Sequence, residues 1–394
     1  MKLFISAGEP SGDLHAAQVI REIKRLSPES EIAFLGGDLM AREAATQPLV
    51  HYRDMAFMGF TEVISHLPTI LRNLSAAKKA IAEMRPDAVL LVDYPGFNMK
   101  LAAYAHSLGI PVYYYIAPKV WAWKEYRVKA LKKYVDRIFS ILPFEPQWFG
   151  ERGLDIEYVG NPSVEEVDSS LAAVPSRTDF FAETGISDDK PLLLLVPGSR
   201  RSEIKYNLPV MDAVAHRHPE VNPIIAGAPG IDGNLYGKYS RLLVVYGHTL
   251  ELMSFARAAL VTSGTASLEC ALAGTPQVVC YRSIGWKPAH DLFKHILKIP
   301  YVSLPNLIAG SIDTETRRQQ NREGTVRGFI IPEMLVHHCN VYEVDAQLSP
   351  LLQQTVERER QLDGYSKMRA RLSSTQSAAL NVASRILNLT NVEH

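Results

Sequence analysis

The chain has 394 residues, of which 47% are hydrophobic and 21% charged, and its 42 basic residues balance 42 acidic ones. A chain of this length exceeds what one hydrophobic core usually supports, so we expect two domains. The composition excludes a disordered protein, and the balanced charge argues against a nucleic-acid-binding protein, which normally carries a strong basic excess.

The cysteines and the first residues bear on the cellular compartment. Cys270, Cys280 and Cys339 form no CxxC pair and are too few for a disulfide framework, so we interpret them as reduced thiols. The start MKLFISAGEPSGD becomes polar too soon for a signal peptide, and no apolar run approaches the roughly 18 residues of a membrane-spanning helix. We therefore expect a cytoplasmic protein that would meet a membrane only at its surface.

Short apolar runs alternate with helical patterns in two successive blocks. The first block contains KLFISAG, EIAFLGG, DAVLLVD, PVYYYIAP and RIFSILP, and the second PLLLLVPGS, NPIIAGAP, RLLVVYG, AALVTSG and PQVVCYR. Such alternation predicts a parallel sheet covered by helices on both faces. Between the blocks, near 162–185, the composition turns acidic and small, which indicates a linker or hinge. The sequence thus predicts two α/β domains.

Polar segments follow the predicted strands, where ligands bind in open α/β sheets, and we expect them to line one cleft between the domains. Asp93 is notable among them because it ends a strongly apolar run and is soon followed by Pro95 and Gly96. An acid in such a place either forms a turn or acts as a reagent. The segments are GEPSGD (8–13), DYPGFN (93–98), APKVWAW (117–123), GNP (160–162), GSRRSE (198–203) and SGTASLE (263–269).

The loop 8–13 leads into a predicted helix. Gly8 and Gly12 would let a ligand approach the backbone, and the N–H groups at the helix start could bind an anion or hydroxyl groups. A helix start capped by Ser11 or Asp13 explains the same residues equally well. The spacing matches neither GxGxxG nor GxxxxGK[ST], so this loop alone does not indicate a nucleotide.

An apolar segment precedes and enters the next helical pattern. A core helix is the ordinary interpretation of such a pattern. The Met and Phe residues that precede it favour the alternative of a surface helix that enters a bilayer or an acyl-chain groove. The basic segment 124–137 would suit anionic lipid, although a solvated helix face explains it as well. The apolar residues are Met58, Phe60, Val63, Ile64, Leu67, Ile70, Leu71 and Leu74.

The loop PGSRRSEI in the second block suits a diphosphate. The guanidinium forks of Arg200 and Arg201, beside Gly198 and Ser199, could bind phosphate oxygens in pairs, and Glu203 could orient one of the arginines. A solvated charged turn is the alternative interpretation.

The loop SGTASLE is a second candidate for phosphate binding. Ser263, Gly264 and Thr265 lie at a predicted helix start, which can hold a phosphate without a metal. Glu269, one turn into that helix, could accept hydrogen bonds from sugar hydroxyls or merely favour the helix N-terminus. Two such loops without a Walker lysine favour a nucleotide-sugar over ATP, whereas ordinary turns would explain either loop alone.

The sequence gives no signal for a metal or for a serine hydrolase. His337, His338 and Cys339 are adjacent and cannot easily share one metal, and no HExxH motif is present. Ser263 lies in TSGTA rather than in a GxSxG elbow, which weakens a hydrolase interpretation. We expect no metal and no cofactor.

Taken together, these stretches resemble the lipid-A-disaccharide synthase family, the membrane-surface glycosyltransferases of Gram-negative lipid A synthesis. The resemblance rests on AGEPSGD, MGFTEV, DYPGFN, YYIAPKVWAW, LPFE, YVGNP, PGSRRSEI, SGTASLE and YVSLPNLIAG, which run in family order from residue 7 to residue 310. PEML at 332–335 continues the pattern. Each stretch is weak alone, and the ordered set is specific.

The resemblance implies an α/β fold of the GT-B type, with two Rossmann-like domains facing across a cleft and C-terminal helices that return to the first domain. We place the acceptor- and membrane-facing domain at 1–165 plus about 365–394, and the UDP-sugar donor domain at 185–345. The implied location is the cytoplasmic face of the inner membrane. The sequence leaves a homo-oligomer open.

The implied reaction joins UDP-2,3-diacylglucosamine to 2,3-diacylglucosamine 1-phosphate (lipid X). UDP leaves with inversion at the anomeric carbon, and the product is a β-1,6-linked tetraacyl lipid A disaccharide 1-phosphate. The resemblance implies no metal and no nucleic acid, so the partners are the two substrates and the membrane surface.

The resemblance also assigns residues, position by position. Asp93 matches the base that takes the proton of the acceptor hydroxyl, and partial burial would raise its pKa and make it a better base. Arg200 would contact the leaving diphosphate. The remaining assignments are Ser199, Glu203, Ser263, Gly264, Thr265, Glu269, Asn306 and Glu333 on the donor side, and Glu9, Ser11 and Asn98 on the acceptor side.

The match departs from the family near the end of the second block. The polar segment 311–330 stands where the family typically has a short connection, and Val336 where it usually has Gln. A flap over the donor and a species-specific decoration are two interpretations of this segment, which leaves the role of Glu333 open.

Two other functions share part of this pattern. A UDP-sugar epimerase can have the same two-domain architecture, but it lacks a lipidic acceptor, which the Met/Phe segment and APKVWAW favour. A nucleotide-sugar sensor without catalysis is the other. Asp93 at a strand end and the full set of matched loops speak against it.

Overall fold

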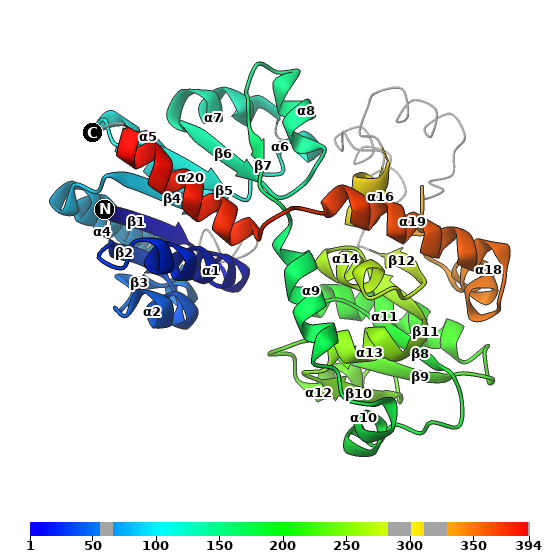
Figure 1. Ribbon diagram of the computed structural model, residues 1–394. Helices are drawn as coiled ribbons and strands as arrows, with labels where there is room; N and C mark the ends of the chain where they lie inside the picture. Colours follow the sequence, from blue (N-terminus) through cyan, green and yellow to red (C-terminus); the bar gives the residue numbers. More distant parts are fainter. Residues whose placement is uncertain (56–65, 124, 283–300, 311–328, 393–394) are drawn as a thin grey trace. The chain divides into compact units, whose positions relative to one another are not determined.

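The computed structural model describes residues 1–55, 66–123, 125–282, 301–310 and 329–392. The chain forms two compact units (Figure 1): Met1–Pro162 with Ser374–His394, and Ser163–Ser373. The last segment rejoins the first unit from Ser374, later than the residue of about 365 expected from the sequence. Helix α19 (Val356–Leu372) stays with the second unit, where Gln361 and the backbone of Gln277 exchange hydrogen bonds of 2.5 and 3.1 Å.

The first unit is built on a parallel sheet with the strand order β3-β2-β1-β4-β5-β6-β7. Its central strands are continuous apolar runs because helices cover both faces of a parallel sheet. The strands are β1 (Lys2–Ala7), β2 (Glu31–Gly36), β3 (Val50–His51), β4 (Ala88–Val92), β5 (Val112–Tyr115), β6 (Arg137–Ser140) and β7 (Glu157–Tyr158).

The last helix of the chain completes the core of the first unit. α20 (Ala378–Val392) lies beside α1 (Pro10–Leu26) and buries Val382 and Ile386 against residues of β1, β4 and β5 (Figure 1). The other helical segments are α2 (Asp38–Ala44), η1 (Tyr52–Asp54), α4 (Leu67–Met84), α5 (Pro95–Ser107), α6 (Val120–Trp123), η2 (Glu125–Arg127), α7 (Val128–Tyr134) and α8 (Glu145–Gly150).

The second unit repeats this plan with the parallel strand order β10-β9-β8-β11-β12-β13. One apolar cluster lies under α11 and α18, and another lies under α10 and α13, on opposite faces of the sheet. The strands are β8 (Leu192–Val196), β9 (Asn222–Gly227), β10 (Leu243–Tyr246), β11 (Ala256–Thr262), β12 (Gln277–Tyr281) and β13 (Glu333–Leu335). The helices besides α19 are α9 (Pro162–Ala172), α10 (Arg177–Thr184), α11 (Arg201–Ala215), α12 (Gly233–Tyr236), α13 (Thr249–Phe255), α14 (Thr265–Leu272), α16 (Leu304–Ala309) and α18 (Val341–Leu352).

The prediction of a linker or hinge near 162–185 is confirmed only at its start, because the boundary between the two units falls after Pro162. That segment forms α9 and α10, and α10 buries Phe180 and Phe181 in a core of the second unit. Phe180 and Phe181 are the buried residues of this short helix, and the polar composition around them gave no signal for it.

In each sheet the first strand lies inside the sheet: the next strands along the chain are added on one side of it, and the later strands on the other side. β1 has β2 on one side and β4 on the other, and β8 is likewise placed between β9 and β11. Open α/β sheets bind ligands outside the carboxyl ends of the strands at such a switch point. The polar loops after β1, β4, β8 and β11 therefore occupy the two expected sites.

Among the described residues, no helix combines the length and the apolar character that crossing a bilayer requires.

Candidate functional site

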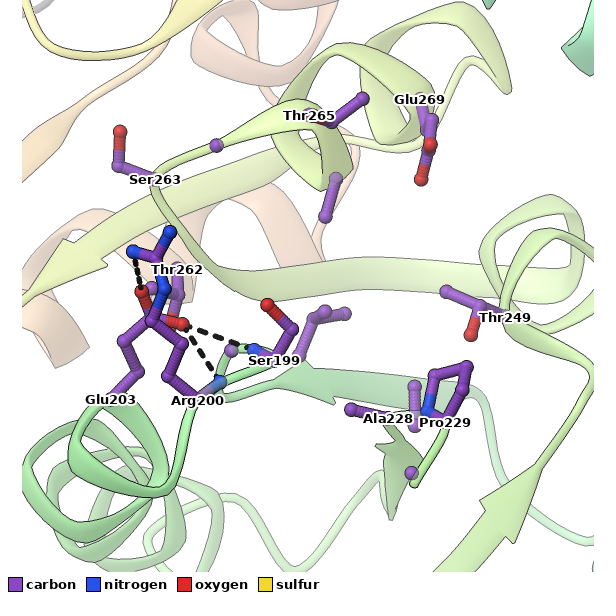
Figure 2. A pocket seen from close by; sticks show the side chains of 16 residues that line it. Ser199, Arg200, Glu203, Ala228, Pro229, Thr249, Thr262, Ser263, Thr265 and Glu269 are labelled. Atoms are coloured by element: carbon purple, nitrogen blue, oxygen red, sulfur yellow. Dashed lines mark hydrogen bonds and ion pairs between the residues drawn. The ribbon is translucent and has the colours of Figure 1, made fainter. Parts of the chain in front are cut away.

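The switch point of the second unit holds a pocket of about 360 Å³. This volume lies within the roughly 300–1,000 Å³ of small-molecule sites. Its walls are the residues that follow β8, β9 and β11, together with the start of α13 (Figure 2). Of the predicted donor residues, the pocket brings together Ser199, Arg200, Glu203, Ser263, Gly264, Thr265 and Glu269.

The start of α11 is organised by Glu203. Its carboxylate accepts hydrogen bonds from the backbone N–H groups of Ser199 and Arg200 at 3.0 and 3.2 Å. It also accepts one from Nη1 of Arg200 at 3.1 Å, as the dashed lines in Figure 2 show. Gly198 has a φ of +116°, and a Cβ there would lie 2.5 Å from a Glu203 oxygen. Glu203 therefore shapes the loop, and Arg200 presents a side chain that is 64% exposed.

The opposite wall is the start of α14. Gly264 is its N-cap residue, with a φ of 153°, and open space surrounds the position of a Cβ there. Since the first N–H groups of a helix lack partners within the helix, this wall suits an anion. The hydroxyl of Ser263 donates its hydrogen bond to the carbonyl of Val302 at 3.0 Å. In this arrangement the hydroxyl could only accept a hydrogen bond from a ligand.

Glu269 lies one turn further along α14 and also faces the pocket (Figure 2). Burial raises the pKa of its carboxyl, and the nearby carboxylate of Glu166 raises it further. A carboxyl in these surroundings is stabilised by donors such as hydroxyl groups, because they replace lost water.

Asn306 and Glu333 do not line the pocket formed by the described residues. Asn306 is 0% exposed and Glu333 is 1% exposed. The carboxylate of Glu333 accepts hydrogen bonds from the backbone N–H groups of Val302 and Ser303 at 2.9 and 3.0 Å and from Nδ2 of Asn306 at 2.8 Å. In this structure the two residues fasten the start of α16 to β13.

Several pocket residues were missed by the sequence analysis. Ala228 and Pro229, directly after β9, and Thr249, the first residue of α13, line the pocket (Figure 2). The available signal was the Gly-Ala-Pro turn directly after an apolar strand. Gly227 begins this turn because a Cβ there would lie 2.5 Å from ring atoms of Tyr246.

Asp93 follows β4 at the switch point of the first unit. Its backbone N–H donates to the carbonyl of Tyr115 at 3.0 Å, and its φ of 45° is in the left-handed region. Burial raises the pKa of the carboxyl, and the positive charge of Lys119 and a hydrogen bond from the backbone N–H of Tyr94 partly offset this rise. A raised pKa makes the ionised carboxylate a stronger base, which is the direction that general-base catalysis favours.

The start of α1 does not have the side-chain cap by Ser11 or Asp13 that the sequence suggested. Asp13 does not cap its own helix: its carboxylate accepts from the N–H groups of Gly37, Leu39 and Met40 at 2.7, 3.2 and 3.2 Å and so caps α2. Gly8 accommodates the ring of Tyr94, since a Cβ would lie 2.3 Å from it.

The acceptor-side residues occupy different depths. Ser11 is exposed, and Glu9 is the N-cap residue of α1. Asn98 is 0% exposed, and its amide is hydrogen-bonded inside the first unit.

The predicted membrane or acyl residues are only partly described. Met58, Phe60, Val63 and Ile64 lie outside the described residues. On α4, Leu67 and Leu71 are 45% and 50% exposed, Ile70 is half-buried and Leu74 is buried. One face of α4 thus belongs to the core, and its first turns present apolar side chains to the surface.

Among the described residues, no group of three or more His, Cys, Asp or Glu side chains could hold a metal ion.

Solved structures share the fold at low sequence identity. A UDP-GlcNAc 2-epimerase from Neisseria meningitidis, bound to UDP-GlcNAc, superposes with a TM-score of 0.61 and 14% identity over 100% of both chains. CalG4, the calicheamicin glycosyltransferase, superposes with a TM-score of 0.54 and 15% identity, over 100% of this chain and 98% of that one. These similarities show the GT-B-type fold alone.

Sequence relatives are more specific. The lipid-A-disaccharide synthase of Myxococcus xanthus is 35% identical over 397 residues, covering 98% of this chain and 97% of that protein. The enzyme of the same name from Nitrosococcus oceani is 38% identical over 315 residues, which covers 78% of this chain and 80% of that protein. Residues 3–387 match the family described as lipid-A-disaccharide synthetase. The chain therefore belongs to the lipid-A-disaccharide synthase family.

Proposed function

We propose that this protein joins UDP-2,3-diacylglucosamine to 2,3-diacylglucosamine 1-phosphate (lipid X), giving the β-1,6-linked tetraacyl disaccharide 1-phosphate and UDP. The observation that carries this proposal is family membership over almost the whole chain. The reaction needs a site for the leaving diphosphate and a base for the attacking hydroxyl. The pocket after β8 would be that site, and the carboxyl after β4 would be that base.

Arg200 and the start of α14 would bind the diphosphate of the donor. As the bond to the anomeric carbon breaks, negative charge grows on the UDP oxygen. An exposed guanidinium and fixed N–H groups can stabilise that charge without rearranging, which lowers the barrier. Glu203 supports this by fixing the loop that carries Arg200.

Asp93 would act as the general base. The acceptor hydroxyl attacks the anomeric carbon from the face opposite UDP, its proton passes to the carboxylate, and the configuration inverts. Because burial raises the pKa of Asp93, turnover should fall as the pH drops through a range above that of an ordinary aspartate.

The substrates of this reaction are lipids, so we place the protein at a membrane surface, on the cytoplasmic face of the inner membrane. The exposed leucines Leu67 and Leu71 of α4 support this placement, as do the exposed Lys129, Lys132 and Lys133 of α7. Apolar side chains that enter the interface and cations that attract anionic headgroups each favour binding to anionic bilayers.

Mass spectrometry of the products tests the proposed reaction. Incubation with both substrates should give the tetraacyl disaccharide 1-phosphate and UDP, and Asp93→Asn should lower turnover about 10²–10⁴-fold while UDP binding is retained. Incubation with the UDP-sugar alone should leave it unchanged, whereas an isomerised sugar would establish the epimerase alternative. Wild-type turnover by Asp93→Asn would remove the assignment of the base.

A further inference from the structure

Strained backbone gathers where β4 and β5 end. Asp93 and Tyr94 have φ angles of 45° and 47°, and Ile116, directly after β5, has a φ of 63°. None of them is glycine, and side chains in the left-handed region crowd the backbone. Such strain persists only where the surrounding structure fixes it, and it is common at sites where geometry matters for function.

Two buried side chains fix the peptide group that follows Asp93. The hydroxyl of Tyr114 donates to the carbonyl oxygen of Asp93 at 2.6 Å, and Nδ2 of Asn98 donates to the same oxygen at 2.8 Å. Tyr114 and Asn98 are both 0% exposed. A carbonyl oxygen has two lone pairs, so these two donors satisfy it and set the orientation of its peptide plane.

Asn98 is itself held in one orientation. Its Oδ1 accepts from the hydroxyl of Ser6 at 2.7 Å, and its Nδ2 also lies 3.2 Å from the carbonyl oxygen of Val92. A flipped amide would place its oxygen against carbonyl oxygens, which repel it. Ser6 is in β1, next to β4, so the support reaches across the switch point of the sheet.

Tyr114 is the middle residue of three successive tyrosines in β5. Because side chains alternate along a strand, Tyr113 and Tyr115 lie in the apolar cluster on the side of α1 and α20, and Tyr114 points to the opposite face. Tyr114 could contribute to packing as phenylalanine does. The hydroxyl adds hydrogen bonding at the turn after β4, above all to the backbone of Asp93.

We propose that Tyr114, together with Asn98, is a positioning residue that holds Asp93 in a left-handed backbone conformation and so aims its carboxylate for proton transfer. This inference rests on the proposed role of Asp93 as the base. Neither residue can touch a substrate, since both are buried. Without the Tyr114 hydroxyl the turn can relax, and the carboxylate moves with it.

The test compares Tyr114→Phe with Tyr113→Phe, which removes an equally buried hydroxyl on the other face of the sheet. Tyr114→Phe should lower kcat about 10- to 100-fold, because small displacements of a catalytic group are costly, while KM for both substrates stays within about twofold. Tyr113→Phe should leave kcat unchanged. Wild-type kcat in Tyr114→Phe, or an equal loss in Tyr113→Phe, would overturn the proposal.

A double-mutant cycle with Asp93→Asn separates this inference from the proposed function. If Tyr114 acts through the base, Tyr114→Phe should add no more than about a twofold loss to Asp93→Asn, since residues of one unit are not additive. A full additional loss would show that Tyr114 acts elsewhere. An active Asp93→Asn would refute the base itself, whereas an inactive Asp93→Asn with an unaffected Tyr114→Phe would refute only the positioning role.

Discussion

Arg200 and Arg201 are neighbours in the chain, yet they have different surroundings. Arg200 lines the pocket and bonds to Glu203, whereas Arg201 is the first residue of α11 and is not among the lining residues of the described part of the chain. The sequence motif GSRRSE presents both arginines equally. The pair therefore provides a test with a built-in control.

Arg200→Ala should lower kcat/KM for the UDP-sugar about 10- to 100-fold, which corresponds to the loss of a hydrogen bond to a charged group. Both kcat and KM should change, because the guanidinium would bind the diphosphate in the ground state and stabilise it as it leaves. Steady-state kinetics with varied donor measure this. Arg201→Ala should stay within about twofold of the wild type, and equal effects of the two substitutions would exclude a special role of Arg200.

The position of a residue at a strand end could be predicted, but the direction of its side chain could not. Seven predicted donor residues, from Ser199 to Glu269, line one pocket because parallel strands bring their carboxyl ends to one edge. Asn98 in α5, Asn306 in α16 and Glu333 in β13 instead turn inward to bond the backbone. Residues that line the pocket and residues that turn inward are polar in the same way and have similar spacing. The sequence alone therefore does not distinguish the two groups.

At the scale of elements, the loop after β1 and the turn after β4 depend on each other through Gly8. A Cβ at Gly8 would lie 2.3–2.7 Å from ring atoms of Tyr94. The hydroxyl of Tyr94 donates to the carbonyl of Met55 at 2.6 Å, so the ring has little freedom to move away. Packing between the two loops thus explains why the first glycine of AGEPSGD, Gly8, is a glycine.

Gly8→Ala should destabilise the first unit by about 1–3 kcal/mol, because an added methyl group in a filled space forces its neighbours apart. Turnover should fall as well, since Tyr94 follows Asp93 directly. Urea unfolding and steady-state kinetics measure the two effects. Gly96→Ala is the control: nothing lies within 4 Å of a Cβ there, so neither property should decrease. A stable, fully active Gly8→Ala protein would contradict this account of the loop.

At the scale of the whole molecule, each unit carries a separate part of the proposed reaction. The second unit holds the pocket proposed for the donor phosphates, and the first holds the carboxyl proposed for the acceptor hydroxyl together with the exposed start of α4. α20 ties the C-terminal end of the chain into the core of the first unit. A defect in membrane binding should therefore arise in the first unit and leave donor binding intact.

Leu67→Ser combined with Leu71→Ser should lower binding to vesicles that contain anionic lipid. Each half-exposed leucine that enters the bilayer contributes about 1 kcal/mol, so the pair should account for about a tenfold to thirtyfold change in the partition coefficient. Vesicle flotation measures this, and UDP affinity should be unaffected. Leu49→Ser is the control, because Leu49 is 51% exposed but lies beside β3, away from α4 in the sequence. If the double variant floats like the wild type, or if Leu49→Ser loses as much binding, then α4 is not the membrane-facing surface and its exposed leucines have another role.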